Sequence, residues 1–306
     1  MTFLRRNEHG QAIVLSVLAL VVLFGACAIA VDVGAWLREK RQLQAAADSA
    51  ALAAAQVLPG STTSADTLAK QYATKNGRTA KTVTFSSATV SNDTVQVTVE
   101  TDNAGFFSGV LGITTTKITR AASARSSAPA QLSIVAPITI GSDNPQLKCG
   151  APCYGQEINL VALPTGSYDG NFTNFQLIDL SKNGGNVSPA QVAEWLRRGY
   201  NGYLSPGQYP GTASTTFNSP EFKQAMDDMK GKEIVVFVHS SANGGEGAPG
   251  ALYQEVGWGA FHITKYTGTS SMGTLTGYFT SVNMNGVPSS DPNQKTWGVR
   301  TINLVS

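Results

Sequence analysis

The chain is poor in charged residues, in histidine and in cysteine, and each shortage narrows what the protein can do. Charged residues make up 14% of the 306 residues, against roughly a quarter in an average soluble protein. The formal net charge is only +2 and no basic stripe is visible, so nucleic-acid binding is not supported. Low charge together with abundant Gly, Ser, Thr and Asn indicates a β-rich extracytoplasmic protein rather than a cytosolic enzyme.

The sequence also lacks the motifs by which many enzymes are identified. No P-loop or Rossmann fingerprint follows any predicted strand, and there is no G-x-S-x-G turn. Two of the three histidines, His239 and His262, lie after the N-terminal apolar segment, both in predicted strands. Ser240 follows His239, but no spacing identifies the acidic partner that a Ser–His pair needs. We therefore expect a protein that is not an enzyme and that binds no cofactor.

One predicted strand ends in a pattern that is similar to a known metal site. In FQLIDLSKN, residues 175–183, Asp179 and Ser181 match the first two positions of the D-x-S-x-S signature of von Willebrand A domains. Asn183 stands where the last Ser of that signature would be. A polar strand end explains the same residues, and we expect that arrangement rather than a metal site.

The chain has three cysteines, and two of them are close together. Cys149 and Cys153 form the segment C-G-A-P-C, in which Gly150 and Pro152 favour a tight turn, whereas Cys27 lies in the apolar segment. No second Cys or His cluster completes a zinc tetrad. We predict a Cys149–Cys153 disulfide in an oxidising compartment, with free thiols or half a metal site as the alternatives. So small a ring adds little through chain entropy, and its effect would be to fix one turn.

The longest apolar run, Ala12–Val31, has no charged residue. A helix of that length spans the hydrocarbon core of a bilayer, roughly 30 Å. A cleaved signal peptide is the alternative, since Arg5 and Arg6 give a basic start and small-x-small sites occur near the end of the run. A helical pattern that continues through Trp36 favours an uncleaved anchor. We therefore predict a cytoplasmic stub at residues 1–11 and a transmembrane helix in the lipid bilayer at residues 12–31.

The orientation of this span follows from two opposing signals. Arg5 and Arg6 precede the span, whereas Arg38, Lys40 and Arg41 follow it, and this count slightly favours the reverse orientation. However, only eleven residues precede the span, and the long segment after it carries the cysteine pair that suits an oxidising space. We predict a single-pass protein of the cytoplasmic membrane with its N-terminus inside and its body outside.

A second helical pattern, Arg38–Leu58, follows the span and is rich in strong helix formers. Pro59 and Gly60 end it; joined to the span without a break, it would form a rod of about 70 Å. Small and apolar side chains recur on one narrow face, namely Leu43, Ala47, Ala50, Ala54 and Val57. This stripe has two interpretations: it packs on the chain's own sheet, or it lets a helix of a partner subunit approach closely. The five residues are thus the predicted partner contact.

The remaining patterns predict an α+β protein with two extramembrane units. The first, residues 32–126, continues with a helix at Thr63–Lys75 that has Ser64 as its N-cap, and with a small antiparallel sheet. In this sheet Val95, Val97 and Val99 alternate with polar residues, and Thr116–Ser126 is the third strand. A short apolar helix is predicted from Phe106, Phe107, Val110 and Leu111. Residues 127–131, S-A-P-A-Q, are the expected linker.

Residues 132–306 predict a second α+β domain with a mainly antiparallel sheet. Helices are expected to open at Ser188-Pro189 and Ser219-Pro220, with Gly199 as a stop signal, and residues 200–219 have the composition of a surface loop. Pro137 indicates a sheet edge for the first strand. The expected strands are 132–140, 157–163, 175–180, 232–239, 253–266, 274–284 and 296–305.

Three segments in the first sixty residues together resemble a known family. They are RRNEHGQA at 5–12, AVDVG at 30–34 and RQLQAAADSAALAAA at 41–55. They resemble the N-terminal domain of TadG-like Flp pilus-assembly proteins, over about a fifth of the chain. The resemblance implies a membrane-anchored structural or assembly component of the tight-adherence machinery, which builds Flp (type IVb) pili, with other pilus-assembly subunits as partners.

The chain departs from the pilins of that system at one position. Those pilins carry a Gly cleavage site with Glu five residues further on, whereas here Gly10 is followed by Gln11 and position 15 is Leu15. The resemblance therefore implies a retained anchor rather than a polymerising pilin. The alternative function is an anchored surface domain that binds a cell-wall polymer or another ligand.

Overall fold

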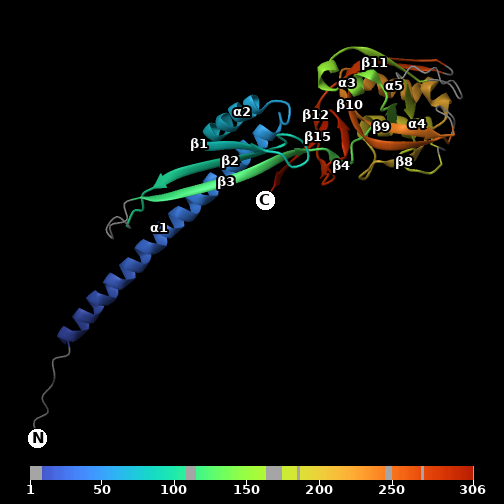
Figure 1. Cartoon of the computed structure of the whole chain (residues 1–306). Helices are drawn as coiled ribbons and strands as arrows, with labels where there is room; N and C mark the ends of the chain where they lie inside the picture. Colours follow the sequence, from blue (N-terminus) through green and yellow to red (C-terminus); the bar gives the residue numbers. More distant parts are fainter. Residues whose placement is uncertain are drawn as a thin grey trace, which may run out of the picture. The chain divides into compact units, whose positions relative to one another are not determined.

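The computed structural model describes residues 9–107, 115–162, 174–184, 187–244, 250–269 and 272–305 (Figure 1). The chain divides into two compact units, each of which is described by itself. Unit 1 comprises Met1–Ser86, Thr94–Arg125 and Leu304–Ser306, and unit 2 comprises Ser87–Asp93 and Ser126–Asn303. Helices and mainly antiparallel sheets occur together, so the predicted α+β class is confirmed.

Unit 1 is built on α1, a single unbroken helix from His9 to Ala55 (Figure 1). At 1.5 Å per residue it is about 70 Å long, as expected for the span joined directly to the helix after it. The helix ends three residues before Leu58, because the N–H groups of residues 56–58 bond to carbonyls three residues back and tighten the last turn. The part of the expected stub that lies at residues 1–8 is outside the described residues.

A second helix, α2 (Thr62–Lys75), packs beside the C-terminal half of α1 (Figure 1). Its N-cap is Ser61 rather than the expected Ser64, since Ser61 Oγ accepts a hydrogen bond from the Ser64 N–H at 3.1 Å. Every fourth residue of α2 is a buried alanine: Ala65, Ala69 and Ala73. These small side chains let the two helices approach closely.

The sheet of unit 1 contains β1 (Ala80–Ser86), β2 (Thr94–Asn103) and β3 (Thr116–Ser127), paired in antiparallel order. The alternation predicted for β2 is confirmed, because Val95, Val97 and Val99 are fully buried. They lie on the side that packs on α1. Phe106 and Phe107 form a bend after β2 rather than a helix, and Val110 and Leu111 lie outside the described residues.

Unit 2 contains one large sheet with the strand order β6-β11-β10-β9-β5-β7, to which β8 and β14 add at β10. All pairs are antiparallel except β5 with β9 and β10 with β14. The longest strand, β10, pairs with β9 along one side and with β8, β14 and β11 along the other. The strands are β5 (Ile138–Gly141), β6 (Ile158–Ala162), β7 (Phe175–Leu177), β8 (Gly207–Pro210), β9 (Glu233–Asn243), β10 (Leu252–Gly268), β11 (Gly273–Phe279) and β14 (Lys295–Trp297).

This sheet is buried on both faces, and β9 shows why its sequence is an apolar run. Val236 and Val238 point into the core beneath the helices, whereas Val235 and Phe237 point into a second core on the other face. Successive side chains of a strand alternate between faces, so both sets must be apolar. The prediction of a fully buried strand here is confirmed.

Two predicted helices, α4 (Pro189–Arg198) and α5 (Pro220–Asp228), cover one face of this sheet. Each begins as predicted, with a serine N-cap and a proline in the first turn. Gly199 ends α4 at φ +78°, where a Cβ atom would lie 2.8 Å from the Ile134 Cα atom. The short α3 (Pro145–Cys149), η2 (Ala151–Cys153) and η3 (Ser214–Asn218) complete the helical content of the described residues.

Residues 200–219 were expected to be a surface loop, and that prediction is wrong. They contain β8 and η3, and the side chains of Tyr209 and Phe217 are buried in the two cores. Tyr209 lies opposite Tyr253 in the β8–β10 ladder. The Gly, Pro and Ser content gave a loop prediction, but pairing with a distant strand determines the structure of this segment.

The expected edge strand 132–140 is also wrong, because residues 133–137 separate two different strands there. β4 (Pro129–Leu132) pairs with β13 (Gly286–Pro288), whereas β5 lies inside the large sheet between β9 and β7. Pro137 has no backbone N–H, but it lies just before β5, so no hydrogen bond between the strands is lost. The expected linker overlaps β4, where the Trp258 Nε1–H donates to the Pro129 carbonyl at 2.8 Å.

The predicted C-terminal strands differ from the observed ones in their ends. The expected strand 274–284 is two strands, β11 and β12 (Val282–Asn283). The last strand, β15 (Val299–Val305), pairs with β12 in parallel. It therefore does not complete the meander that follows from β10 and β11.

Candidate functional site

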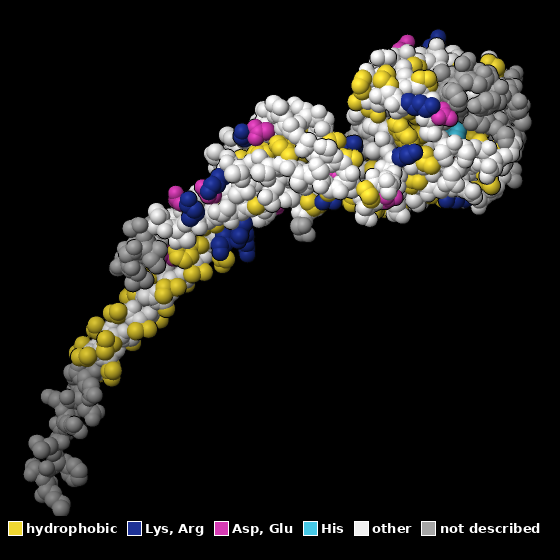
Figure 2. Space-filling model, viewed as in Figure 1, with side chains coloured by type: hydrophobic (Ala, Val, Ile, Leu, Met, Phe, Trp, Pro, Cys, Tyr) yellow, Lys and Arg dark blue, Asp and Glu magenta, His cyan; other side chains and the backbone are white. Residues whose placement is uncertain are grey.

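The N-terminal part of α1 exposes apolar side chains along its length (Figure 2). Its large apolar side chains are at least half exposed, from 50% at Leu20 and Val31 to 72% at Val22. Among the described residues, α1 is the helix that is long and apolar enough to cross a membrane. An exposed apolar surface of this size needs an apolar environment, which supports the predicted lipid contact of residues 12–31. Cys27 lies in this stretch as a free, exposed thiol.

Asp32, the first residue after the apolar run, is buried with 3% of its surface exposed. Its Oδ1 accepts a hydrogen bond from the Phe106 N–H at 2.7 Å. The Phe107 N–H donates to Oδ2 at 3.0 Å and to Oδ1 at 3.3 Å. Hydrogen bonds to a carboxylate are among the stronger ones in proteins. They connect the bend after β2 to the point on α1 where the apolar run ends. This contact was not predicted from the sequence, in which an acid directly after the apolar run is its local sign.

The predicted partner contact on α1 lies inside unit 1. Leu43, Ala47, Ala50 and Ala54 are fully buried, and Val57 is partly buried. The helix packs on α2 and β2, so the chain's own elements cover the face on which a partner helix was expected. Of the two interpretations, intramolecular packing describes these side chains, and the partner interpretation is corrected. Alanine is needed here because two helices and a strand meet closely.

Polar side chains connect the same helix to the segment after α2. Arg78 Nη2 lies 2.7 Å from Glu39 Oε1 and 3.0 Å from Gln42 Oε1. Asn76 Nδ2 donates to Ser49 Oγ at 2.8 Å. On the side of α1 opposite the stripe, Arg38, Arg41 and Ala45 are exposed, whereas Asp48 and Leu52 are partly buried. Beyond the apolar run α1 thus has one face committed to unit 1 and another that is accessible.

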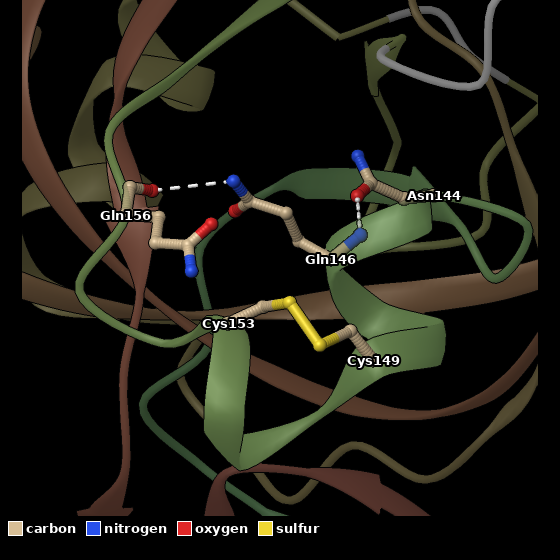
Figure 3. The surroundings of a disulfide bond; sticks show 5 residues. All are labelled: Asn144, Gln146, Cys149, Cys153 and Gln156. Carbon is tan, nitrogen blue, oxygen red and sulfur yellow. Dashed lines mark hydrogen bonds between the residues drawn. A yellow bond between two sulfur atoms is a disulfide. The ribbon is translucent and has the colours of Figure 1, made fainter.

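The two cysteines of unit 2 are joined as the sequence predicts (Figure 3). Cys149 ends α3 and Cys153 ends η2, with their Cα atoms 5.8 Å apart. Asn144 caps α3 by accepting a hydrogen bond from the Gln146 N–H at 2.9 Å. The Gln146 side chain donates in turn to the Gln156 carbonyl at 3.3 Å. The disulfide therefore belongs to a small turn that is also held by hydrogen bonds.

A buried polar cluster in unit 2 includes one of the two histidines considered for catalysis. Thr139 Oγ1 lies 2.9 Å from His239 Nδ1 and donates to Glu255 Oε2, also at 2.9 Å. His239 and Glu255 are nearly inaccessible to solvent. Ser240 is exposed on the other side of β9 and donates to the Gln254 carbonyl. The structure therefore places Ser240 and His239 on opposite sides of β9.

The carboxyl group of Glu255 has a strongly raised pKa. Burial raises its pKa well above the usual value, and the hydrogen bond from Thr139 offsets only part of that. Its Oε1 atom has no hydrogen-bond partner among the described residues. The pKa of Tyr209 is raised to about 12 by burial, with a contribution from the charge of Glu255. Glu255 is thus a carboxyl that the fold favours in its neutral form.

We predict that Glu255→Gln removes a pH dependence of stability. A carboxyl with a raised pKa holds its proton more tightly in the folded state, so wild-type stability should fall as pH rises above about 4.5. The slope for one proton is at most about 1.4 kcal/mol per pH unit. The variant carries a neutral side chain of the same shape and should give a flatter profile. Thermal unfolding of the full chain in detergent between pH 5 and 8 measures this, with the exposed Glu221→Gln as control. Equal slopes for the wild type and Glu255→Gln would contradict the prediction.

The remaining site candidates have structural partners. His262 Nδ1 lies 3.2 Å from Glu233 Oε1, and its ring stacks on Tyr278. Asp179 accepts hydrogen bonds from the Ser181 N–H and Oγ–H and from the Asn183 N–H. Its carboxylate thus closes its own turn, as a polar strand end would. Among the described residues no group of three or more His, Cys, Asp or Glu could hold a metal ion.

Unit 2 also has an open cleft of about 600 Å³. Its lining is mixed, with one aromatic ring, amides and charges of both signs. The ion pair between Lys148 and Asp143, with an N–O distance of 3.1 Å, lies on one side of the cleft. Other lining residues include Asp291, Asn293, Gln294, Trp297 and Arg300.

Comparison with known proteins identifies the N-terminal part of the chain. Residues 10–57 match the family described as putative Flp pilus-assembly TadE/G-like. The match includes the apolar run, Asp32 and the buried stripe, so the predicted family resemblance of this segment is confirmed. Neither the curated proteins nor the solved structures gave a match to the chain.

Proposed function

We propose that the TadE/G-like segment makes this protein a membrane-anchored structural or assembly component of a Flp (type IVb, tight-adherence) pilus or a related secretion system. One observation carries the proposal. The family match at residues 10–57 coincides with a single helix that exposes apolar side chains first and then enters the core of unit 1. The matched segment therefore connects a bilayer directly to a folded unit, as an anchored scaffold component requires.

The proposal includes an orientation and a retained anchor. The short N-terminal stub lies in the cytoplasm, and the chain after residue 31 lies outside it. The Cys149–Cys153 disulfide supports this, because such bonds persist in oxidising compartments. Leu15, at the position where pilins carry Glu, supports an anchor that is not processed.

The role is structural rather than enzymatic. Of the two histidines considered for catalysis, His239 is hydrogen-bonded to Thr139 and His262 lies 3.2 Å from Glu233. Asp179, considered for a metal site, accepts hydrogen bonds from its own turn. The polar cluster around Glu255 is enclosed in the core of unit 2. These hydrogen bonds stabilise the fold, and they support a structural role for these side chains.

Deletion and complementation test the proposed role. In the encoding organism, loss of the gene should abolish or sharply reduce Flp pili counted by electron microscopy, and the full chain should restore them. A variant in which a cleavable signal peptide replaces residues 1–31 exports the same body without its anchor, and it should not restore pili. Full restoration by this released body would contradict the anchored role.

We predict that the mature protein keeps its N-terminus and forms the disulfide. Intact-mass analysis of membrane-extracted protein should include residues before Gly10, and non-reducing peptide mapping should link Cys149 to Cys153. A reporter that is active only outside the cytoplasm, fused after Ser306, should be active. A mature N-terminus at Gln11 would contradict the retained anchor. If this fusion is inactive and a second reporter, active only in the cytoplasm, is active at the same position, the proposed orientation is wrong.

The cleft of unit 2 favours the second candidate function, an anchored domain that binds a cell-wall polymer. An aromatic ring beside amides and carboxylates, as at Trp297, Asn293 and Asp291, suits a polyhydroxylated chain. Titration of the full chain with wall glycan should then show saturable binding that Trp297→Ala weakens. Non-saturable or variant-independent binding would remove this candidate.

A further inference from the structure

Two exposed aromatic side chains lie next to the end of the apolar run. Phe106 and Phe107 are 77% and 47% exposed. Both follow the end of β2 at Asn103, on the strand that packs on α1. Large apolar side chains are costly to leave in water, and phenylalanine is among the residues by which interfacial segments insert at the boundary between headgroups and acyl chains.

The hydrogen bonds of Asp32 set the height of this bend along α1. Both backbone nitrogen atoms lie within 3.3 Å of the carboxylate of the residue that follows Val31. The helix carries apolar side chains up to that residue and basic ones soon after it, at Arg38 and Arg41. The two phenyl rings therefore lie at the level where a bilayer spanned by residues 12–31 would end.

We propose that the Phe106–Phe107 bend is a second membrane contact, inserted at the boundary between lipid headgroups and acyl chains, with Asp32 as its positioning residue. The inference rests on the proposed anchoring. The apolar surface of α1 itself extends past Asp32 to the level of this bend, because Val33 and Leu37 are also exposed, by 41% and 50%. A single helix lets the body tilt and rotate against the membrane, and a second contact on a different element restricts both motions.

Site-specific fluorescence tests this in the full chain. The disulfide protects Cys149 and Cys153, so the native Cys27 is the thiol left for an environment-sensitive probe. In a Cys27→Ser background the same probe is placed by Phe106→Cys or, as a control, by Gln71→Cys. Gln71 is exposed on α2; Asn76, which follows that helix, bonds Ser49, about 26 Å along α1 from Asp32.

Each protein is reconstituted in phosphatidylcholine–phosphatidylglycerol vesicles that contain spin-labelled lipid. The probe at position 106 should be blue-shifted and quenched most by a label near the headgroup. The probe at Cys27 should be quenched most by a label at the middle of the acyl chain, and the probe at position 71 by neither. Adding Asp32→Asn should reduce quenching at position 106 toward that at position 71, whereas Asp48→Asn on the same helix should not.

The outcomes separate this inference from the anchoring on which it rests. If the probe at position 106 behaves like that at position 71 while Cys27 is quenched, the anchor stands and the second contact is overturned. If the probe at Cys27 is not quenched, the anchoring itself fails, and the inference with it. If the emission of the probe at position 106 shifts to the blue only when other pilus subunits are present, the bend contacts protein rather than lipid, and the proposal is overturned.

Discussion

Replacing Asp93 by alanine is expected to lower the free energy of unfolding of the chain by about 3–5 kcal/mol. The Asp93 side chain is fully buried in the turn between β1 and β2. Its carboxylate accepts hydrogen bonds from the N–H groups of Ala88, Thr89 and Val90 and from the Thr89 hydroxyl, at 2.7–3.0 Å. Alanine would leave all four donors without that acceptor.

The effect of this substitution should also depend on pH. Burial raises the pKa of Asp93, but the four hydrogen bonds outweigh it and hold the pKa well below the usual range. A group with a depressed pKa stabilises the fold above its unfolded pKa, near 3.8, and that stabilisation is lost as pH falls toward the folded value. The difference between wild type and variant should therefore be constant from about pH 5 to 8 and narrow below about pH 4.

Denaturant unfolding of the full chain in detergent measures this difference. The matched control is Asp291→Ala, because Asp291 also accepts a backbone hydrogen bond in a turn, from the Asn293 N–H, but is exposed. We expect that control to cost less than about 1 kcal/mol. An equally small loss for Asp93→Ala would show that the turn has other sources of stability.

Local patterns in the sequence predicted those elements whose cause is local. The serine and proline signals at α4 and α5 act within one helical turn, and so does the Cys149–Cys153 spacing. The alternation at Val95–Val99 likewise reflects one strand on one core. These predictions needed no knowledge of what lies opposite each element in the fold.

The errors occurred where the deciding partner is far away in the chain. Tyr209 is a strand residue because β10 lies beside it, and Pro137 precedes an interior strand because β9 and β7 enclose β5. The contact of Asp32 with Phe106 joins residues 74 positions apart. The pairings of β8 and β5 cannot be read from a short window of sequence, and the acid after the apolar run does not by itself indicate a partner at Phe106.

The stripe on α1 shows a different limit. Small side chains at helical spacing permit close approach to any partner, whether in the same chain or in another one. The sequence left both interpretations open, and the burial of Ala50 against the chain's own elements decides between them. The family match supports a pilus role for this segment, but by itself it does not identify the face that contacts other subunits.

Replacing Ala50 by leucine should destabilise unit 1 by about 1–3 kcal/mol, because the added isopropyl group has no space between α1, α2 and β2. Ala45→Leu is the matched control, since it makes the same change on the exposed face of the same helix. Alanine and leucine have similar helix propensities, so the control should change stability by no more than about 0.5 kcal/mol.

Thermal unfolding and co-purification of pilus subunits, measured on both variants, separate packing from assembly. We expect Ala50→Leu to lower the melting temperature by several degrees, with any loss of partners following from that loss of stability. A variant at Ala50 that keeps its melting temperature but loses its partners would restore the partner interpretation of the stripe. Loss of partners by Ala45→Leu at unchanged stability would instead assign assembly to the exposed face of α1, which the packing of unit 1 leaves accessible.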